Sequence, residues 1–133
     1  MSFDVILERD GIVRMRDGVA LSIDIYRPAR DGAPVPGRFP VLLERTPYGK
    51  RRVVLNQAGE FFAKQGYVVV MQDVRGRFAS EGEWYFLQEQ EGPDGFDTMA
   101  WIAGQPWCDG NIGTIGLSYS TATQQALAVL HPP

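Results

Sequence analysis

The sequence predicts an α/β protein in which an antiparallel hairpin leads into alternating strands and helices, in the order β-β-β-α-β-α-β-α. Residues 67–74 (YVVVMQDV) form an apolar run without alternation, which is typical of a strand covered on both faces. Segments with apolar residues at helical spacing follow the third, fourth and fifth predicted strands. Right-handed crossovers between such units build a parallel sheet with helices on both faces.

The N-terminal part of the chain is predicted to form β-structure. Residues 11–28 contain two strands around an Asp-Gly pair at 17–18, a dipeptide that favours a tight hairpin turn. The second strand, ALSIDIY at 20–26, alternates apolar and polar residues, as a half-buried antiparallel strand does. A loop rich in Gly and Pro at 29–38 then leads to a largely apolar third strand within 39–48.

Three segments are predicted to be helical, at residues 53–65, 94–105 and 118–130. Gly66 is placed to end the first helix, and a short strand at 111–116 precedes the third. The apolar face of the first helix is expected to consist of Val54, Leu55, Ala58, Phe61 and Phe62. That of the second is expected to consist of Phe96, Met99, Ala100 and Ala103.

Composition and charge exclude several classes of function. The chain has 133 residues, enough for one domain (1–133) with one hydrophobic core. A net charge of −3 disfavours nucleic acid and anionic membranes as partners. The sequence has no apolar run that could span a bilayer, and its start does not resemble a secretory signal. We therefore expect a cytoplasmic protein.

Neither a metal nor a cofactor is expected. Cys108 and His131 are the only residues of their types, which excludes an internal disulfide and is too few for a zinc site. The glycines of DGNIGTIG at 109–116 lack the G-x-G-x-x-G order of a dinucleotide-binding loop. A nucleotide-binding protein is therefore disfavoured.

Ser118 is the strongest candidate for a catalytic residue. It lies in GLSYS (116–120), between a predicted strand and a predicted helix, where a sharp turn lifts a side chain above the carboxyl edge of the sheet. Such a turn needs small residues two positions before and after the serine, which here are Gly116 and Ser120. The alternative is a serine that caps the last helix. The order of the elements favours the nucleophile.

Four segments, in this order, carry a wider resemblance: MRDGVALSIDIYRP, FPVLLERTPYGK, VVVMQDVRGRFASEGEW and QPWCDGNIGTIGLSYS. They resemble the opening hairpin, the third strand with its tyrosine loop, the Asp-x-Arg-Gly segment and the nucleophile approach of one family. That family comprises cocaine esterases, α-amino-acid ester hydrolases and Xaa-Pro dipeptidyl-peptidases. One difference is Thr121, which stands where the family pattern Gly-x-Ser-Tyr-x-Gly has its last glycine. Its Cβ is expected to crowd the first helical turn unless the backbone has room.

The resemblance implies the first half of an α/β-hydrolase fold, truncated after the nucleophile helix, and it implies three site residues. Ser118 is the nucleophile in this interpretation. Tyr48 matches the tyrosine whose hydroxyl donates to the oxyanion in the family. The backbone N–H of Tyr119 is the second donor, because the residue after an elbow nucleophile lies at a helix N-terminus. The alternative for Tyr48 is a turn residue that packs on the surface after Pro47.

His131 is not expected to be the general base. It lies 13 residues after Ser118, which in a helix places the two roughly 20 Å apart, whereas a base must lie within about 3 Å of its nucleophile. The resemblance implies that the Asp and His of the triad follow on later strands, along with a cap and a C-terminal β-sandwich. The fifth predicted strand would then be an open edge, and we expect this chain to be marginally stable, to form a homo-oligomer, or to bind a chain that completes the sheet.

Other noticeable side chains are predicted to be structural. Asp73 and Arg75, at the end of a strand, are expected to pair and to pin a loop. The expected contacts between helix and sheet involve Phe96, Trp101 and Trp107. A long loop near the mouth of the cleft carries Trp84, Tyr85 and Phe86. Charges that favour a helix dipole are expected at Glu89, Glu91, Asp94 and Asp97.

The sequence therefore predicts a serine hydrolase, or its N-terminal portion, that acts on a small-molecule ester or amide through an acyl-enzyme. Esters are slightly favoured, because no acidic cluster that would hold a free amino terminus is present. The alternative is a binding or assembly module that retains the scaffold without catalysis. The missing base and Thr121 favour that alternative.

Overall fold

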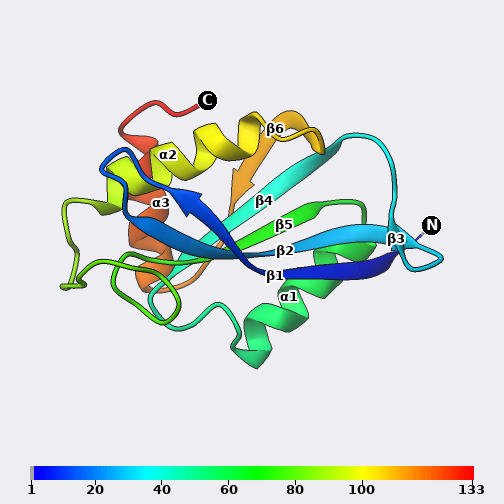
Figure 1. Ribbon diagram of the computed structural model, residues 1–133, viewed down its shortest axis with the longest axis horizontal. Helices are drawn as coiled ribbons and strands as arrows, with labels where there is room; N and C mark the ends of the chain where they lie inside the picture. The colour runs from blue at the N-terminus through cyan, green and yellow to red at the C-terminus, as the bar shows by residue number, and fades with distance from the viewer. Residues whose placement is uncertain (1) are drawn as a thin grey trace.

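A mixed β-sheet with the strand order β1-β2-β5-β4-β6 organises residues 2–133, which the computed structural model describes (Figure 1). Its strands are β1 (Asp4–Arg14), β2 (Ala20–Arg30), β4 (Phe39–Thr46), β5 (Val68–Asp73) and β6 (Cys108–Thr114). The first two form the predicted antiparallel hairpin, and β5 pairs antiparallel with β2. β4 runs parallel to both β5 and β6, so the predicted α/β class is confirmed. A two-residue strand, β3 (Ala33–Pro34), pairs with β2 within the segment predicted to be a loop.

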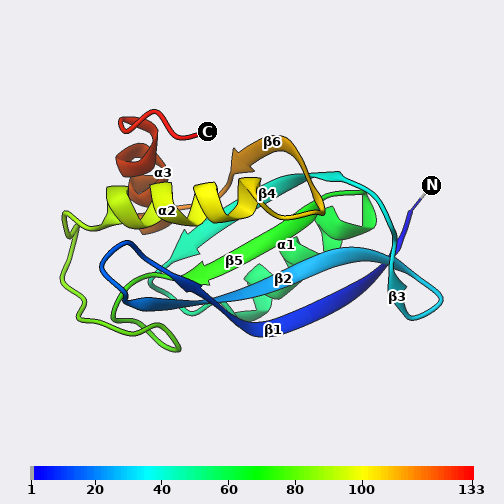
Figure 2. The same cartoon turned by 45° about the horizontal axis from the view of Figure 1, so that its top comes forward.

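The helices cover both faces of this sheet, as predicted. α1 (Val53–Lys64) lies on one face, and α2 (Glu91–Ala103) and α3 (Tyr119–Ala128) lie on the other (Figures 1 and 2). The backbone at Gly66 has φ +100° just after α1 ends, which confirms its expected role as a helix stop. No helix in residues 2–133 is long and apolar enough to cross a membrane.

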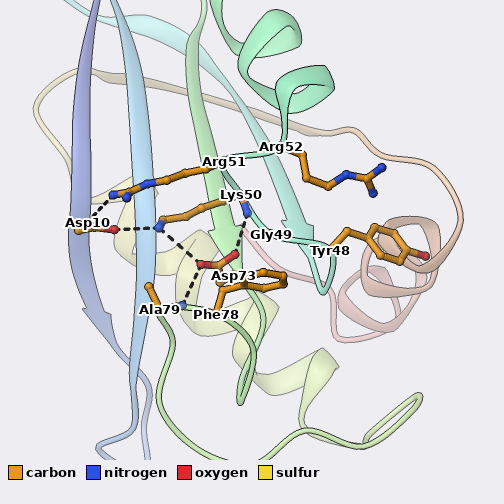
Figure 3. Close-up of a pocket in the computed structure, with 9 residues that line it drawn as sticks. All are labelled: Asp10, Tyr48, Gly49, Lys50, Arg51, Arg52, Asp73, Phe78 and Ala79. Atoms are coloured by element: carbon orange, nitrogen blue, oxygen red, sulfur yellow. Dashed lines mark hydrogen bonds and ion pairs between the residues drawn. The ribbon is translucent and has the colours of Figure 1, made fainter.

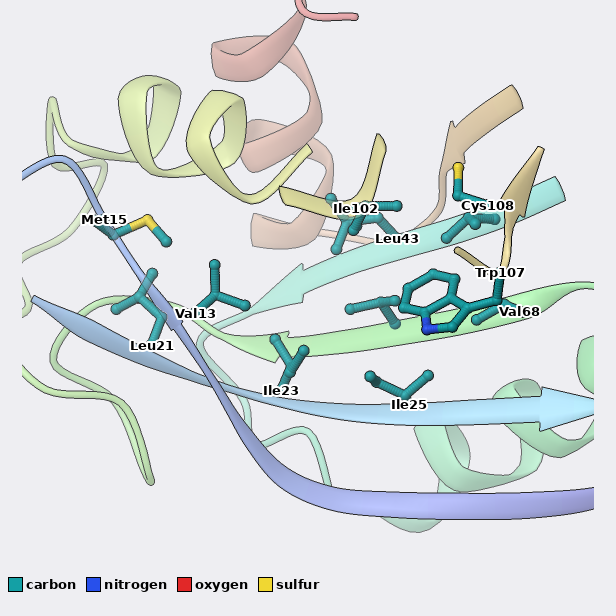
Figure 4. Close-up of a cluster of buried hydrophobic side chains, with 12 residues drawn as sticks. Val13, Met15, Leu21, Ile23, Ile25, Leu43, Val68, Ile102, Trp107 and Cys108 are labelled. Carbon is teal, nitrogen blue, oxygen red and sulfur yellow. The ribbon is translucent and has the colours of Figure 1, made fainter. Parts of the chain in front are cut away.

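The larger hydrophobic core lies between the sheet and α2 (Figure 4). Trp107 and Ile102 pack there on side chains from β1, β2, β4 and β5, and Trp101 packs against the cluster from its edge. The predicted role of the two tryptophans is confirmed. Phe96 lies outside this cluster, beneath the guanidinium of Arg16 at 5.8 Å, so its predicted place in the core is wrong.

Both predicted helix faces are partly wrong, because glycines on both helices, and polar residues on α2, face inward. On α1 the buried residues are Leu55, Gly59 and Ala63, whereas Val54 is 66% exposed and Phe61 58% exposed. On α2, Ala100 and Ala103 are exposed, and the buried residues are Glu91, Gly92, Asp94, Gly95, Thr98, Met99 and Ile102. Each helix turns glycine inward where a large neighbour comes close. A pattern of apolar residues misses such a face, because glycine carries no side chain to count.

The predicted half-burial of β2 is also wrong, since Ser22 and Asp24 are as buried as their apolar neighbours. β2 is an internal strand, and its polar face is covered by charged residues from other elements. The Asp24 carboxylate accepts from the backbone N–H of Asp10 at 2.9 Å and pairs with Arg9 at 3.2 Å. A register shift of β1 between Glu8 and Gly11 turns Asp10 toward this face.

β6 has a strand on one side only within the described part of the chain, as expected for the fifth predicted strand. Its ladder is to β4 alone, and residues 109–111 are exposed. A single-sided strand leaves backbone hydrogen-bonding groups available to another strand. Association through this edge remains a prediction.

Gly59 sets how closely α1 approaches the sheet. A Cβ added there would lie 2.7 Å from the Tyr26 ring, so we expect Gly59→Ala to lower the free energy of unfolding by about 1–3 kcal/mol through overpacking. Urea unfolding measures this change. Gly104→Ala is the matched control, because its Cβ would meet nothing closer than 3.6 Å. Equal stability of the two variants would contradict the prediction.

Candidate active site

Ser118 lies at the sharp junction between β6 and α3, with φ 58° and ψ −124°. A left-handed backbone at a residue with a side chain costs energy and persists only where the surroundings enforce it. The hydroxyl of Ser118 does not cap α3, which rules out the alternative of a helix-capping serine. Gly116 has φ +139°, and a Cβ there would lie 2.4 Å from the Cβ of Ser120. The turn therefore requires the small residue that the sequence has.

The three residues predicted from the family resemblance meet at this turn. The Tyr48 hydroxyl donates to Ser118 Oγ at 2.9 Å and accepts from the Tyr119 backbone N–H at 3.0 Å. The pKa of the Tyr48 phenol is lowered because its phenolate can accept a hydrogen bond from the Ser118 hydroxyl and another from the Tyr119 N–H. Ser118 and Tyr48 are exposed, so a substrate can reach both. Tyr48 is not merely a surface turn residue, because its hydroxyl contacts the nucleophile candidate.

A buried lysine fixes the loop that carries Tyr48 (Figure 3). The backbone N–H of Lys50 donates to Asp73 at 2.8 Å, and its Nζ lies 2.9 Å from Asp10 and 3.4 Å from Asp73. The Lys50 side chain is 2% exposed, and its buried charge is compensated by Asp10, Asp73 and, at 3.6 Å, Asp24. Gly49 has φ +98° between the two, and Tyr48 points away from the lysine toward α3. The contacts of Lys50 therefore fix the loop from the side opposite to the Tyr48 ring.

Thr121 does not crowd the first turn of α3. Its side chain is exposed, and its hydroxyl donates to the carbonyl of Gly116 at 3.3 Å. The backbone N–H of Thr121 donates to the Ser118 carbonyl at 2.9 Å, so the helix starts without distortion. The departure from the family pattern is accommodated by space on the solvent side.

A cavity of about 470 Å³ opens between α1 and the elbow and is lined by Ser118, Tyr48 and apolar side chains. The acid in this cavity is Glu44, which is 7% exposed. Burial raises the pKa of Glu44, and the nearby Ser120 hydroxyl, which has no hydrogen-bond partner of good geometry, offsets this only in part. Among the described residues, every other buried carboxylate has a basic partner, namely Asp24, Asp73, Glu91 and Asp94.

The hydrogen bonds of Ser118 Oγ within residues 2–133 do not include one to a candidate general base. Of the partners found for Ser118 Oγ, none is a histidine or a carboxylate. His131 follows the C-terminal end of α3, whereas Ser118 precedes its N-terminal end, so the two lie at opposite ends of the helix as predicted. The described residues also contain no group of three or more His, Cys, Asp or Glu side chains that could hold a metal ion.

The predicted pair of Asp73 and Arg75 is wrong. Asp73 accepts from Lys50 and from the backbone N–H of Ala79, whereas Arg75 pairs with Asp94 at 2.8 Å and with Asp17. These ion pairs raise the pKa of the Arg75 guanidinium. Each side chain still pins a loop, but with a partner distant in sequence.

The predicted helix-dipole charges are correct only in part. Glu91 and Asp94 lie in the first turn of α2, but both are buried and paired with arginines. Glu89 precedes the helix, and Asp97 lies in its second turn, where it pairs with Arg16 at 2.8 Å. Their positions reflect specific partners from other elements.

The aromatic loop predicted near the cleft contacts the nucleophile elbow. The rings of Trp84 and Phe86 lie 6.0 and 5.7 Å from the ring of Tyr119, and both Phe86 and Tyr85 are largely exposed. Sequence reasoning missed Lys50, Glu44 and Arg45 near the site. A basic residue inside the strand FPVLLERT was the available signal for Arg45, because an internal strand does not bury a charge without a partner.

Comparisons with known proteins agree with this fold. The family model of the X-Pro dipeptidyl-peptidase (S15 family) matches residues 17–133. A cocaine esterase from Rhodococcus sp. is 49% identical over 122 residues, which cover 89% of this chain and 20% of the esterase. A CocE/NonD family hydrolase from Staphylococcus aureus has a TM-score of 0.84 at 35% identity and covers 97% of this chain and 26% of its own. An α-amino acid ester hydrolase has a TM-score of 0.79 at 30% identity, over 97% of this chain and 24% of its own.

The raised pKa of Glu44 predicts a pH-dependent stability. The folded state holds this proton more tightly than the unfolded chain does, so the stabilisation is complete below the ordinary value of 4.5 and is lost as pH rises through the raised value. Glu44→Gln removes the titration, so we expect its Tm relative to the wild type to be higher at pH 8 than at pH 4. Thermal unfolding across this range measures the difference, with Glu60→Gln on the exposed side of α1 as the control. A Tm difference that does not change with pH would contradict the prediction.

Proposed function

The chain belongs to the X-Pro dipeptidyl-peptidase (S15) family, and from this premise we propose that it carries the nucleophile and the oxyanion hole of a serine hydrolase. The proposed substrates are small-molecule esters or amides, with esters favoured. Two relatives support esters: the cocaine esterase, and a protein from Mycobacterium bovis named as a putative serine esterase. The chain spans only 20–22% of the length of these relatives, so the activity is proposed for the whole protein that contains it.

The proposal depends on one observation. Tyr48 Oη lies 2.9 Å from Ser118 Oγ and 3.0 Å from the backbone nitrogen of Tyr119. Acyl transfer needs a nucleophilic oxygen beside two donors that can reach one oxyanion. The Tyr119 N–H now donates to the Tyr48 oxygen at 3.0 Å, so in this proposal a substrate oxygen would replace that oxygen as the acceptor of the N–H. A substrate carbonyl would replace Ser118 Oγ as the acceptor of the Tyr48 proton.

The proposed reaction proceeds in two steps. Ser118 Oγ attacks the carbonyl carbon, and the electron pair of the carbonyl bond moves to the oxygen that Tyr48 and the Tyr119 N–H hold. Collapse of this tetrahedral intermediate breaks the bond to the alcohol or amine, which leaves with the proton that the base removed from Ser118, and an acyl-enzyme remains. Water then attacks the acyl group by the same route, which releases the acid and restores the Ser118 hydroxyl.

The proton of Ser118 needs a base, and we propose that it lies on polypeptide outside residues 1–133. His131 is the only histidine in the sequence, and it lies at the wrong end of α3. In hydrolases of this fold the acid and the histidine follow the serine along the chain. The 133-residue chain alone is therefore expected to be inactive.

A fluorophosphonate probe tests the proposal on the full-length natural polypeptide that contains this chain. We expect labelling at Ser118, no labelling of Ser118→Ala, and a loss of kcat of about 10²–10³-fold in Tyr48→Phe, which lacks one oxyanion donor. Tyr67→Phe is the matched control, because its ring packs on Phe62 far from the elbow. If the full-length protein stays unlabelled and hydrolyses no ester, the chain works as a binding module instead.

A further inference from the structure

The side chain of Tyr119 is held by a buried acid that takes no part in the proposed bond-making steps. The Tyr119 hydroxyl donates to Glu91 Oε2 at 2.7 Å and accepts from the Leu87 backbone N–H at 3.2 Å. Its ring is covered by Trp84 and Phe86. Burial, followed by the hydrogen bond to Glu91, raises the pKa of the Tyr119 phenol to about 12, so the phenol remains a donor at all physiological pH values.

Glu91 is itself clamped by an arginine from the sheet. Arg45 Nη2 lies 3.3 Å from Glu91 Oε1, and Arg45 Nη1 donates to the Glu91 carbonyl at 2.8 Å. A third contact, from Arg45 Nε to Gln72 at 2.7 Å, fixes the guanidinium against β5. Both charged side chains are at least 96% buried, so neither can exchange its partner for water. The acceptor of the Tyr119 proton is therefore fixed in space.

This anchor acts on the residue whose backbone N–H is the proposed second oxyanion donor. An oxyanion donor must lie within about 2.7–3.1 Å of the developing charge, and a displacement of 1 Å can cost about 10²-fold in rate. Ser118 next to it has a left-handed backbone that relaxes unless the flanking residues are held. The Tyr119 phenol is buried and bonded to Glu91 of α2, so it holds in place the residue that follows Ser118.

We propose that Glu91 is a positioning residue for the oxyanion hole, and that the Arg45–Glu91 pair holds the Tyr119 N–H at the nucleophile through the Tyr119 phenol. The inference rests on the proposed hydrolase function for its catalytic consequence. Its structural part, the restraint of the Tyr119 N–H, does not depend on activity. The two parts can therefore fail separately.

Amide hydrogen exchange tests the restraint directly. In the full-length natural polypeptide, Glu91→Ala is expected to speed exchange of the Tyr119 N–H at least about tenfold, because the elbow opens locally more often. Asp97→Ala is the matched control: it removes a carboxylate from the same helix and breaks the pair with Arg16, but it does not touch Tyr119. Unchanged exchange of the Tyr119 N–H in Glu91→Ala overturns the proposal, whatever the enzyme does.

Steady-state kinetics test the catalytic consequence. Tyr119→Phe keeps the ring and removes the hydroxyl, so we expect kcat for a p-nitrophenyl ester to fall about 10–100-fold with KM within about twofold. Glu91→Gln retains an oxygen that accepts the phenol proton and is expected to keep more activity than Glu91→Ala. The double variant Glu91→Ala/Tyr119→Phe is expected to be no slower than the slower single variant, because Glu91 acts through the phenol.

The outcomes separate the inference from the function on which it rests. Losses that multiply in the double variant, or a fall in Tm with kcat unchanged, show a general structural role and overturn the proposal. If the wild type hydrolyses nothing and Ser118 is unlabelled, the proposed function fails, and hydrogen exchange alone decides whether Glu91 restrains the elbow. If exchange is unchanged while Ser118 is labelled, the hydrolase stands without this restraint.

Discussion

The left-handed backbone of Ser118 is the constraint on which the rest of the site depends. A residue with a side chain leaves this conformation unless its neighbours prevent it, at a cost of about 1–3 kcal/mol. Here β6 ends at Thr114, four residues before Ser118, and α3 begins at Tyr119. Gly116 admits Ser120 on the inside of the turn, and the phenol of Tyr119 is tied to Glu91 on the outside. The strained backbone of Ser118 is therefore held by its neighbours on both sides, through the packing of Gly116 on Ser120 and the hydrogen bond of Tyr119 to Glu91.

Topology brings Tyr48 to this turn from a segment 70 residues earlier. β4 and β6 are adjacent parallel strands, so the loops that follow them leave the same edge of the sheet. The two loops are fixed by separate buried charges. Lys50 ties the Tyr48 loop to β1 and β5, and Arg45 ties the elbow to α2. Because both cations are buried, and Asp73 and Glu91 are buried with them, moving either loop would separate desolvated charges.

Most strands and helices could be predicted from local sequence patterns, whereas the site also depends on contacts between residues distant in sequence. The run VVVMQD and the Asp-Gly turn predict their strands because the relevant physics, burial on both faces and a tight turn, is local. The pairing of Asp73 with Lys50, and of Arg75 with Asp94, depends on which loops lie beside β5, and nearness in sequence pointed to the wrong pair. Gly59 and Gly95 face neighbours only because of how the helices pack. Tyr48 could be found because a family resemblance supplies its long-range partner, which spacing along the chain does not.

The hydrogen bonds at Ser118 also show how a nucleophile can be arranged before its base is in place. Tyr48 donates to Ser118 Oγ and in turn accepts from Tyr119, so this chain of donors ends on the serine oxygen as an acceptor. Ser118 therefore keeps its own proton, and none of the described residues accepts it. That proton is what a general base must remove. The elbow and the two proposed oxyanion donors thus form one unit within residues 48–119, and we propose that the base comes from another part of the polypeptide that reaches the free side of Ser118 Oγ.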